Sequence, residues 1–498
     1  MTSTFHGLQT AYKGLMAQQR ALQTTGHNIA NANTPGYTRQ RVNFNASQAF
    51  PAPGMNAPSI AGQIGTGVDV ESVQRVRDEF LDLQYRGESS RAGYWGKMHE
   101  AHIRMEDIMN EPTDSGLGVV MDDFWRAIEV LADNPSDKSA REVVRQQGET
   151  LADTYNYIVD SLTSVQQELK HELDGTTKQV NTLLEQIHNL NEDINRLEPH
   201  GYLPNDLYDE RDRLIDELSE LIPIEVKHAE LDSRGNRHPS APGPLEIHLK
   251  NAGDGESKIL DADGFLEMTV TENESGNAVR SITFNSSSDE DDNIPLIIPL
   301  DIPSQHGKVA ALVESYGYVE GEGEDAQVVG VYPEMLDELQ GMMNEFVDNF
   351  NDRHSDGTTL NGGDAGDFFI FDEGENRLTL HENINNLDNI AASSNGVSGD
   401  GSNALVLSNQ IEQLQESYRA IIGEMAVATN NAARMDYTSG VRQSTIDQNR
   451  LSMSAVSLDE EMVNMISFQH AYNASARQIT MIDEMLDRII NGMGIVGR

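Results

Sequence analysis

The sequence contains no cysteine, which excludes disulfide bonds and thiolate chemistry. It also lacks a long apolar run. The densest stretch, residues 294–300, reads IPLIIPL, whereas a membrane-spanning helix needs about 20 apolar residues. The opening MTSTFHGLQT has no basic region followed by an apolar segment, so we expect no cleavable secretory signal. These absences indicate a protein that is neither embedded in a membrane nor held together by disulfides.

Basic residues are scarce: 35 Lys and Arg stand against 81 Asp and Glu, a formal net charge of -46. Phosphate binding needs clustered Lys and Arg, so nucleic acid is excluded as the main partner, and docking on an anionic membrane is disfavoured. Self-repulsion of this size destabilises a compact fold at low salt, and 0.1 M salt screens it within about 10 Å. We therefore expect a salt-adapted source.

Carboxylates are absent from the first 68 residues, and Asp69 is the first acidic residue of the chain. The same segment carries Lys13, Arg20, Arg39 and Arg41. We interpret it as a segment packed against protein rather than exposed to solvent.

Apolar residues recur every seven positions at both ends of the chain, which is typical of a coiled-coil helix. The N-terminal helix, expected over about residues 4–30, has the seam Leu8, Leu15, Leu22 and Ile29. The C-terminal seam begins at Leu451, and its seven-residue spacing continues without a break. Its members are Leu458, Met465, Tyr472, Ile479 and Leu486, with Phe468, Ile482 and Ile489 at the three-residue offset. The two helices are expected to pair with each other or with neighbouring copies.

Between the termini, apolar spacing predicts a rod-like helix over 151–197, with a slip near Glu172, and helices over 332–352 and 407–435. A further helix over 204–221 has Asn205 and Asp206 as candidate caps. Residues 224–305 alternate apolar and polar positions between turns, which predicts short strands.

The predicted fold is therefore mainly α with a β-rich insertion, nested in three layers, and about three domains suit this length. We expect residues 1–68 and 440–498 to form a terminal helical domain, residues 69–223 and 306–439 a long helical bundle, and residues 224–305 an outer β domain.

Catalytic and metal-binding motifs are not recognisable. His99 and His102 in HEAH are one residue too close for the H-E-x-x-H zinc spacing. Residues 352–357 imitate the first half of a calcium loop, but its twelfth position is Gly363 instead of a glutamate. We therefore expect no enzymatic activity and no cofactor.

Residues 25–40, TGHNIANANTPGYTRQ, are predicted to end the first helix and reverse the chain. Asn28, Asn31 and Asn33 can bond nearby backbone groups. Thr34-Pro35-Gly36-Tyr37 suits a type II turn, because Pro35 fixes φ and Gly36 accepts a positive φ. Tyr37 offers an apolar ring with a polar tip as an anchor.

The segment NIANANTPGY (28–37) resembles the signature of bacterial flagellar axial proteins. Residues 205–221, 344–362 and 457–492 are similar to segments of one axial family, the hook-associated protein 1 (FlgK) family of the hook–filament junction. Residues 224–305 match nothing specific in it.

This resemblance implies a structural protein that forms the first junction ring between hook and filament by packing its terminal helices. The implied partners are copies of itself, the hook protein and the second junction protein. Such proteins reach the outside of the cell through the flagellar type III export apparatus. A cytoplasmic chaperone would cover roughly Leu458 to Ile489 before export.

Two alternatives stay open. The chain could be a hook or rod subunit, although a hook subunit would be mostly β and would lack a helix as long as 151–197. It could also be a secreted enzyme or metal-binding protein that acts through residues 224–305.

Overall fold

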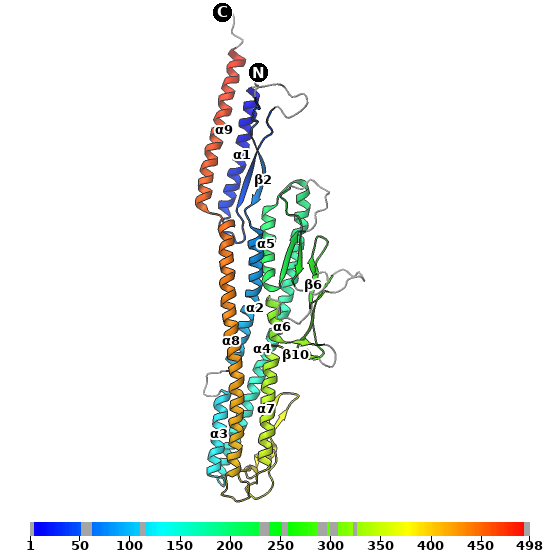
Figure 1. The fold of residues 1–498 in the computed structure, drawn as a ribbon, viewed down its shortest axis with the longest axis vertical. Coiled ribbons are helices and arrows are strands. Elements are labelled where there is room, and N and C mark those ends of the chain that lie inside the picture. Colours follow the sequence, from blue (N-terminus) through cyan, green and yellow to red (C-terminus); the bar gives the residue numbers. More distant parts are fainter. Residues whose placement is uncertain are drawn as a thin grey trace, which may run out of the picture.

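The protein is a long rod whose chain runs out and returns, so that both termini lie at one end (Figure 1). The structure, a computed structural model, describes residues 4–50, 62–109, 116–228, 239–250, 257–286, 296–298, 307–321 and 326–492. None of the helices in this part of the chain combines the length and apolar character that a membrane crossing requires.

The terminal end of the rod holds two helices side by side, α1 (Thr4–Ala30) and α9 (Leu458–Gly492) (Figure 1). An antiparallel hairpin of β1 (Gln40–Ala46) and β2 (Val68–Arg75) packs on α1. The bundle below contains α2 (Glu79–Met109), α3 (Leu117–Asp133), α4 (Lys138–Leu197), α5 (Asn205–Leu221), α6 (Lys308–Tyr316), α7 (Val331–Ser355) and α8 (Ser402–Ser454).

Helix α4 has 60 residues and is about 90 Å long. It begins 13 residues before the predicted start, because Asp137 caps it by accepting a hydrogen bond from the Ser139 backbone N–H. The slip predicted near Glu172 is wrong, since Thr176 is buried and continues the apolar stripe. Glu172 lies beside this stripe and pairs with Lys97 and Lys308, at 2.6 and 3.0 Å.

Helix α5 has the predicted span but not the predicted caps. Pro204 precedes its first turn and makes no side-chain cap. Instead, the Asn205 side chain donates to the Val73 carbonyl of β2 (2.9 Å), and Asp206 accepts from the Gln40 side chain (2.9 Å). Both residues therefore join α5 to the terminal hairpin.

The predicted strands between residues 224 and 286 are present in two sheets beside α4. One sheet has the order β3 (Ile224–His228), β4 (Leu245–Leu249), β5 (Lys258–Leu260). The other has the order β10 (Gln327–Val329), β9 (Tyr318–Glu320), β7 (Val279–Ser286), β6 (Leu266–Glu272), and β8 (Leu296–Ile298) pairs with β7. Strands β9 and β10 follow α6 and are too short to show in the apolar pattern. The fold class is confirmed as mainly α with a β-rich insertion.

The far end of the rod joins α7 to α8 through the β11 (Phe369–Asp372) and β12 (Arg377–Leu380) hairpin and the 3-10 turns η3 (Glu382–Asn385) and η4 (Leu387–Asn389). His354, at the end of α7, is fully buried here. Its Nε2 accepts from the Ala391 N–H (3.0 Å), so its Nδ1 carries the proton and donates to the Gly366 carbonyl (2.6 Å). Both ring nitrogens of this histidine therefore bond backbone and hold the connection in place.

Burial of His354 predicts that the far end of the rod loosens in mild acid. Burial lowers the pKa of this imidazole to about 4, with Arg141 acting in the same direction and the Gly366 carbonyl and Asp367 opposing it. An unfolded histidine titrates near 6.5, so the unfolded state binds more protons between about pH 6.5 and pH 4, and local stability falls as pH decreases through this window. The loss at pH 5 should be about 2 kcal/mol.

Hydrogen exchange of the α7 and β12 amides at pH 7 and pH 5 measures this loss. The variant His354→Gln, whose amide is neutral at both pH values, should lose much less protection than the wild type. Equal losses in both proteins would contradict the assignment to His354.

Candidate assembly site at the joint of the terminal helices

Helices α1 and α9 run antiparallel and approach closely through small side chains. A Cβ atom added to Gly7 would lie 3.3 Å from Cδ1 of Ile482, and one added to Gly14 would lie 3.2 Å from Oγ of Ser475. Ala11 is also buried, at 3% exposed. The four predicted seam residues Leu8, Leu15, Leu22 and Ile29 are each half-buried. Small residues that the heptad pattern did not single out therefore bring the backbones together.

In the predicted seam of α9, Ile482 faces Gly7 of α1 and Phe468 packs against Phe44 of β1, but the seam is not continuous with α8. Helix α8 ends at Ser454 and α9 begins at Leu458, so the unbroken seam predicted from Leu451 is wrong. Ser457 accepts from the Glu460 N–H (3.5 Å) and begins the new helix as in a capping box. Leu458 and Ile489 are exposed, at 48% and 43%. The other seam residues are half-buried: Met465, Phe468, Tyr472, Ile479, Ile482 and Leu486.

The chain reversal after α1 has the predicted type II geometry. The Tyr37 N–H donates to the Thr34 carbonyl (3.2 Å), and Gly36 has φ +79°. The Asn31 side chain donates to the His27 carbonyl (3.1 Å) and so satisfies a carbonyl in the last turn of α1. Pro35 and Gly36 are exposed.

Asn28 lies at the centre of the joint and is 1% exposed. Its Oδ1 accepts from the Tyr37 hydroxyl (2.8 Å) and the Gln40 N–H (3.0 Å). Its Nδ2 donates to the Gln40 carbonyl (2.8 Å) and to Oε2 of Glu461 (3.1 Å). All four hydrogen-bonding positions of the amide are occupied, so one side chain ties α1, its exit turn, β1 and α9 together.

Arg39 connects the same turn to the start of α9. Its guanidinium donates to Glu461 (2.8 Å) and to Glu460 (2.6 Å), and its backbone N–H donates to the Ser454 carbonyl at the end of α8 (2.9 Å). Glu461 is 2% exposed. Burial, together with Asp206, Asp209 and Glu461, raises the pKa of the Tyr37 hydroxyl well above its usual range, so it stays a donor to Asn28.

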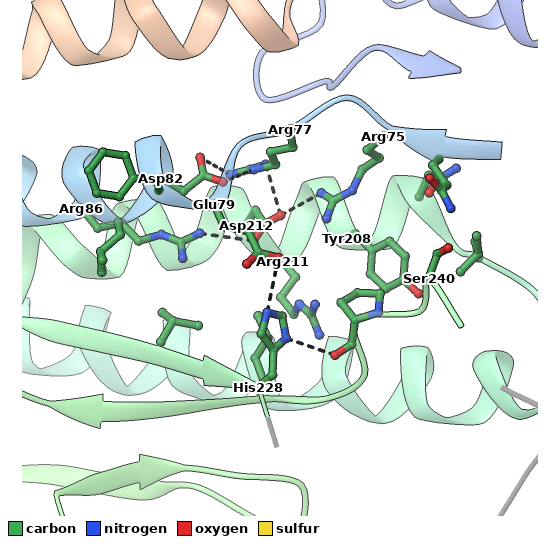
Figure 2. Close-up of a pocket in the computed structure, with 18 of the residues that line it drawn as sticks. Arg75, Arg77, Glu79, Asp82, Arg86, Tyr208, Arg211, Asp212, His228 and Ser240 are labelled. Atoms are coloured by element: carbon green, nitrogen blue, oxygen red, sulfur yellow. Dashed lines mark hydrogen bonds and ion pairs between the residues drawn. The ribbon is translucent and has the colours of Figure 1, made fainter. Parts of the chain in front are cut away.

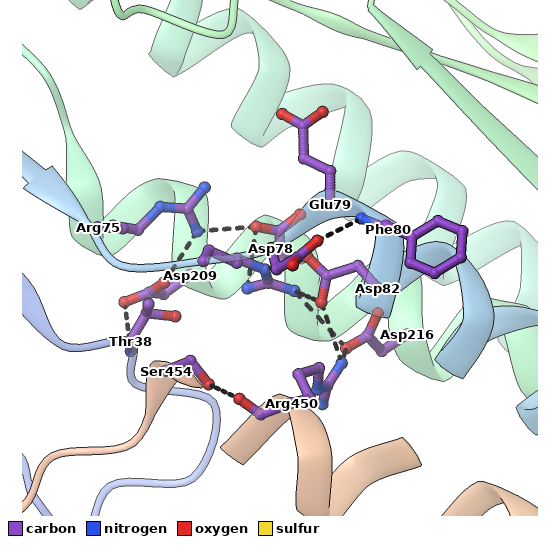
Figure 3. A network of polar contacts seen from close by, with 12 residues as sticks. Thr38, Arg75, Asp78, Glu79, Phe80, Asp82, Asp209, Asp216, Arg450 and Ser454 are labelled. Carbon is purple, nitrogen blue, oxygen red and sulfur yellow. Dashed lines mark hydrogen bonds and ion pairs between the residues drawn. The ribbon is translucent and has the colours of Figure 1, made fainter. Parts of the chain in front are cut away.

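One face of α5 carries the carboxylates that anchor this joint to the bundle (Figure 3). Each carboxylate pairs with arginines from other elements, and Asp209 also accepts from the Thr38 N–H (3.0 Å). The pairs are Arg75 with Asp209 (2.9 Å) and Asp212 (2.7 Å), Arg77 with Asp212 (3.1 Å), Arg86 with Asp212 (3.2 Å) and Asp216 (2.8 Å), and Arg450 with Asp216 (2.5 Å).

Asp212 is the shared centre of the network. Burial alone would raise the pKa of its carboxyl, but Arg77, Arg75 and Arg86 hold that pKa well below the usual range. It therefore stays charged and binds β2, the turn before α2, and α2 itself to α5.

A cavity of about 470 Å³ adjoins this network between α2, α5 and the β3–β4 hairpin (Figure 2). Arg211 lines it and donates to the Asn191 side chain (2.8 Å) and the Gly243 carbonyl (3.2 Å). Arg75, Arg77 and Arg86 also line it, but each is already paired with an aspartate. Within the described residues, no group of three or more His, Cys, Asp or Glu has a metal-like placement. The polar side chains of the joint thus connect segments of the chain.

Comparison with known proteins agrees with this architecture. The family model for the "Flagellar hook-associated protein FlgK helical domain" matches residues 103–369. "Flagellar hook-associated protein 1" of Bacillus subtilis (strain 168) is 42% identical over 522 residues, an alignment that covers 100% of both chains.

The chain belongs to the FlgK family of flagellar hook-associated proteins.

Two further FlgK proteins are less similar to this chain. "Flagellar hook-associated protein 1" of Escherichia coli (strain K12) is 29% identical over 44% of this chain and 39% of its own length. A solved FlgK structure from Burkholderia pseudomallei has a TM-score of 0.45 and 16% identity, and covers 59% of this chain and 47% of that one. Models of flagellar rod proteins match residues 8–38 and 447–492, the two segments that meet at the joint.

Membership of the FlgK family confirms the predicted function as a structural protein of the bacterial flagellum of the hook-associated class. The match to the FlgK helical domain decides against a hook or rod subunit, because the rod-type models cover the terminal segments alone.

The Arg–Asp network was missed at the sequence level. Its signal is present: Asp209, Asp212 and Asp216 are spaced three and four residues apart, which places them on one helical face. Arg75 and Arg77 stand two apart at the end of a strand, so they share one side. Nothing local indicates that the two groups meet.

The shared position of Asp212 predicts a large loss of stability when its charge is removed. Asp212→Asn would leave three buried arginines without their common partner, at a cost of about 3–5 kcal/mol in the free energy of unfolding. Urea denaturation measures this change. The control Glu210→Gln removes a carboxylate from the exposed face of the same helix, where its pair with Arg213 should contribute at most about 1 kcal/mol. Similar losses in both variants would contradict the role assigned to Asp212.

Proposed function

We propose that this chain forms a ring at the hook–filament junction, in which the paired terminal helices of neighbouring copies pack together. The observation that carries the proposal is the apolar surface that α1 and α9 leave exposed. In a pair of helices, each helix covers only the side of the other that faces it, so apolar residues on the remaining sides stay exposed. An extended exposed apolar surface is typical of an interaction site. The exposed residues are Phe5, Tyr12 and Met16 on α1, and Met462, Val463, Ile466, Met481, Met485 and Ile490 on α9.

The joint fixes the orientation of the terminal helix pair relative to the bundle in this proposal. Asn28 and Tyr37 bond each other inside it, Asn31 closes the last turn of α1, and Pro35 and Gly36 form the reversal. Their proposed role is to position the terminal pair relative to the bundle. In this proposal residues 1–68 and 440–498 polymerise, residues 69–223 and 306–439 form the bundle, and residues 224–305 project outward.

Family membership supports the remaining parts of the proposal. The chain leaves the cell without a cleavable signal through the flagellar export apparatus, and it works extracellularly between the hook protein and the second junction protein. A cytoplasmic chaperone covers the apolar face of α9, including the exposed Leu458 and Ile489, before export. The chain acts by assembly and not as an enzyme.

Deleting the gene tests the proposal as a whole. Cells without the protein should build hooks but no attached filaments, and a plasmid copy should restore them. Filaments that remain attached to hooks in the deletion strain would overturn the junction function.

A single-residue test addresses the joint. Asn28→Ala would leave the Gln40 backbone groups, the Tyr37 hydroxyl and Glu461 without their partner inside a buried site, at about 1–3 kcal/mol for each unsatisfied group. Incorporation into flagella, measured by immunoblot of purified filaments with hooks, should fall sharply. The control Asn33→Ala changes an exposed residue of the same turn and should incorporate normally. Normal incorporation of Asn28→Ala would contradict a positioning role for this residue.

A further inference from the structure

The outer face of α8 between Val427 and Met453 shows no exposed carboxylate, although the chain carries 81 acidic residues. At 1.5 Å per residue this face is about 40 Å long. We call it the α8 strip. Its exposed residues are Val427, Asn430, Asn431, Arg434, Tyr437, Val441, Arg442, Ser444, Thr445, Gln448, Asn449, Leu451, Ser452 and Met453.

The two acidic residues in this part of α8 have side chains that are 38% exposed, and each has a close partner. Asp436 pairs with His99 of α2 (3.1 Å), and Asp447 pairs with Arg450 (3.4 Å). The first half of α8, in contrast, exposes Glu412, Glu416 and Glu424 to solvent. Exposed glutamates on α8 therefore end at Glu424, just before the α8 strip begins at Val427.

The α8 strip also has the residue types of a protein interface. Tyr437 is 75% exposed and Val427 71%, and Val441, Leu451 and Met453 are each about half exposed. Arg434 and Arg442 are the exposed charges. Aromatic residues and arginine are enriched in interfaces, whereas carboxylates are depleted.

The charge of the rest of the molecule identifies the partner. A strip with exposed arginines and no exposed Asp or Glu suits an acidic surface, and this chain provides one on α4 and α5, beyond α2 from the strip. There α4 and α5 expose Glu185, Glu192, Glu210 and Glu220, of which Glu192 and Glu210 also pair with Arg196 and Arg213 of their own helices. In Figure 1, α8 lies along one edge of the rod, α5 lies beyond α2 from it, and β6 lies toward the other edge.

We propose that the α8 strip binds the acidic α4–α5 face of a second copy of this chain. A contact between two different surfaces of the same chain is head-to-tail, and it closes into a ring when the rotation between copies allows it. This inference rests on the proposed ring and adds a contact within the bundle to the packing of the terminal helices. It also places opposite charges together in an assembly whose subunits each carry a formal charge of -46.

Site-specific photocrosslinking tests the contact in the full chain. p-Benzoylphenylalanine replaces Tyr437, whose exposed ring can change without disturbing the core, and purified flagella are irradiated. We expect an adduct of twice the chain mass, with the cross-linked peptide from α4 or α5 of the same protein. The purified dilute monomer should give no such adduct. Cross-linking to a different flagellar protein, or no adduct from assembled flagella, would overturn the proposal.

Charge reversal gives a second, independent readout. Arg434→Glu with Arg442→Glu should lower incorporation into flagella about tenfold, because two like-charged surfaces then meet. The control pair Arg126→Glu and Arg353→Glu makes the same charge change at exposed positions near the far end of the rod and should incorporate within about twofold of wild type. Equal incorporation of both double variants would refute the contact.

The two proposals fail in different ways. If filaments persist in the deletion strain, the junction function is wrong. If filaments require the wild-type chain but the α8 strip gives neither the cross-link nor the charge effect, the proposed junction function is retained and the proposed α8 contact is wrong.

Discussion

The buried ion pairs on α5 are the constraint on which the rest of the rod depends. Two segments that are distant in sequence, the connection from β2 to α2 and the end of α8, meet α5 at Asp209, Asp212 and Asp216. Breaking one buried pair leaves an uncompensated charge, so the network is stable only when all its members are in place. The joint to the terminal helices is built on this base through the bond from the Thr38 N–H to Asp209.

The distribution of acidic residues along the chain is consistent with these contacts between segments. Where segments must meet, carboxylates are either missing, as in residues 1–68 and on the α8 strip, or paired with arginine, as at Asp212 and Glu461. The surplus of acid lies on the remaining surface, where water and salt screen it. The exposed positions of the α8 strip thus hold no carboxylate, whereas exposed carboxylates on α4 and α5 supply the opposite charge in the contact that we propose.

The sequence predicted much of the fold, because apolar spacing reports helices directly, and the type II turn at Gly36 follows from local chemistry. It did not predict that Asn28 would bond Glu461, since this pair is separated by 433 residues and depends on how α1 and α9 pack. The break before α9 was missed because heptad counting continued through Leu451, although Ser457 and Glu460 carry a capping-box pattern. Thr176 was missed for a similar reason, since a buried threonine does not count as an apolar position.

The central claim is that the joint makes the terminal helix pair a rigid extension of the bundle. Because the chain has no cysteine, spin labels can be placed at Gln19→Cys on α1 and Arg91→Cys on α2 without background. Pulsed electron paramagnetic resonance then measures the distance between them. We predict one narrow distance distribution that broadens when Arg75→Ala removes the pairs with Asp209 and Asp212. A distribution that is equally broad with and without Arg75 would contradict the claim.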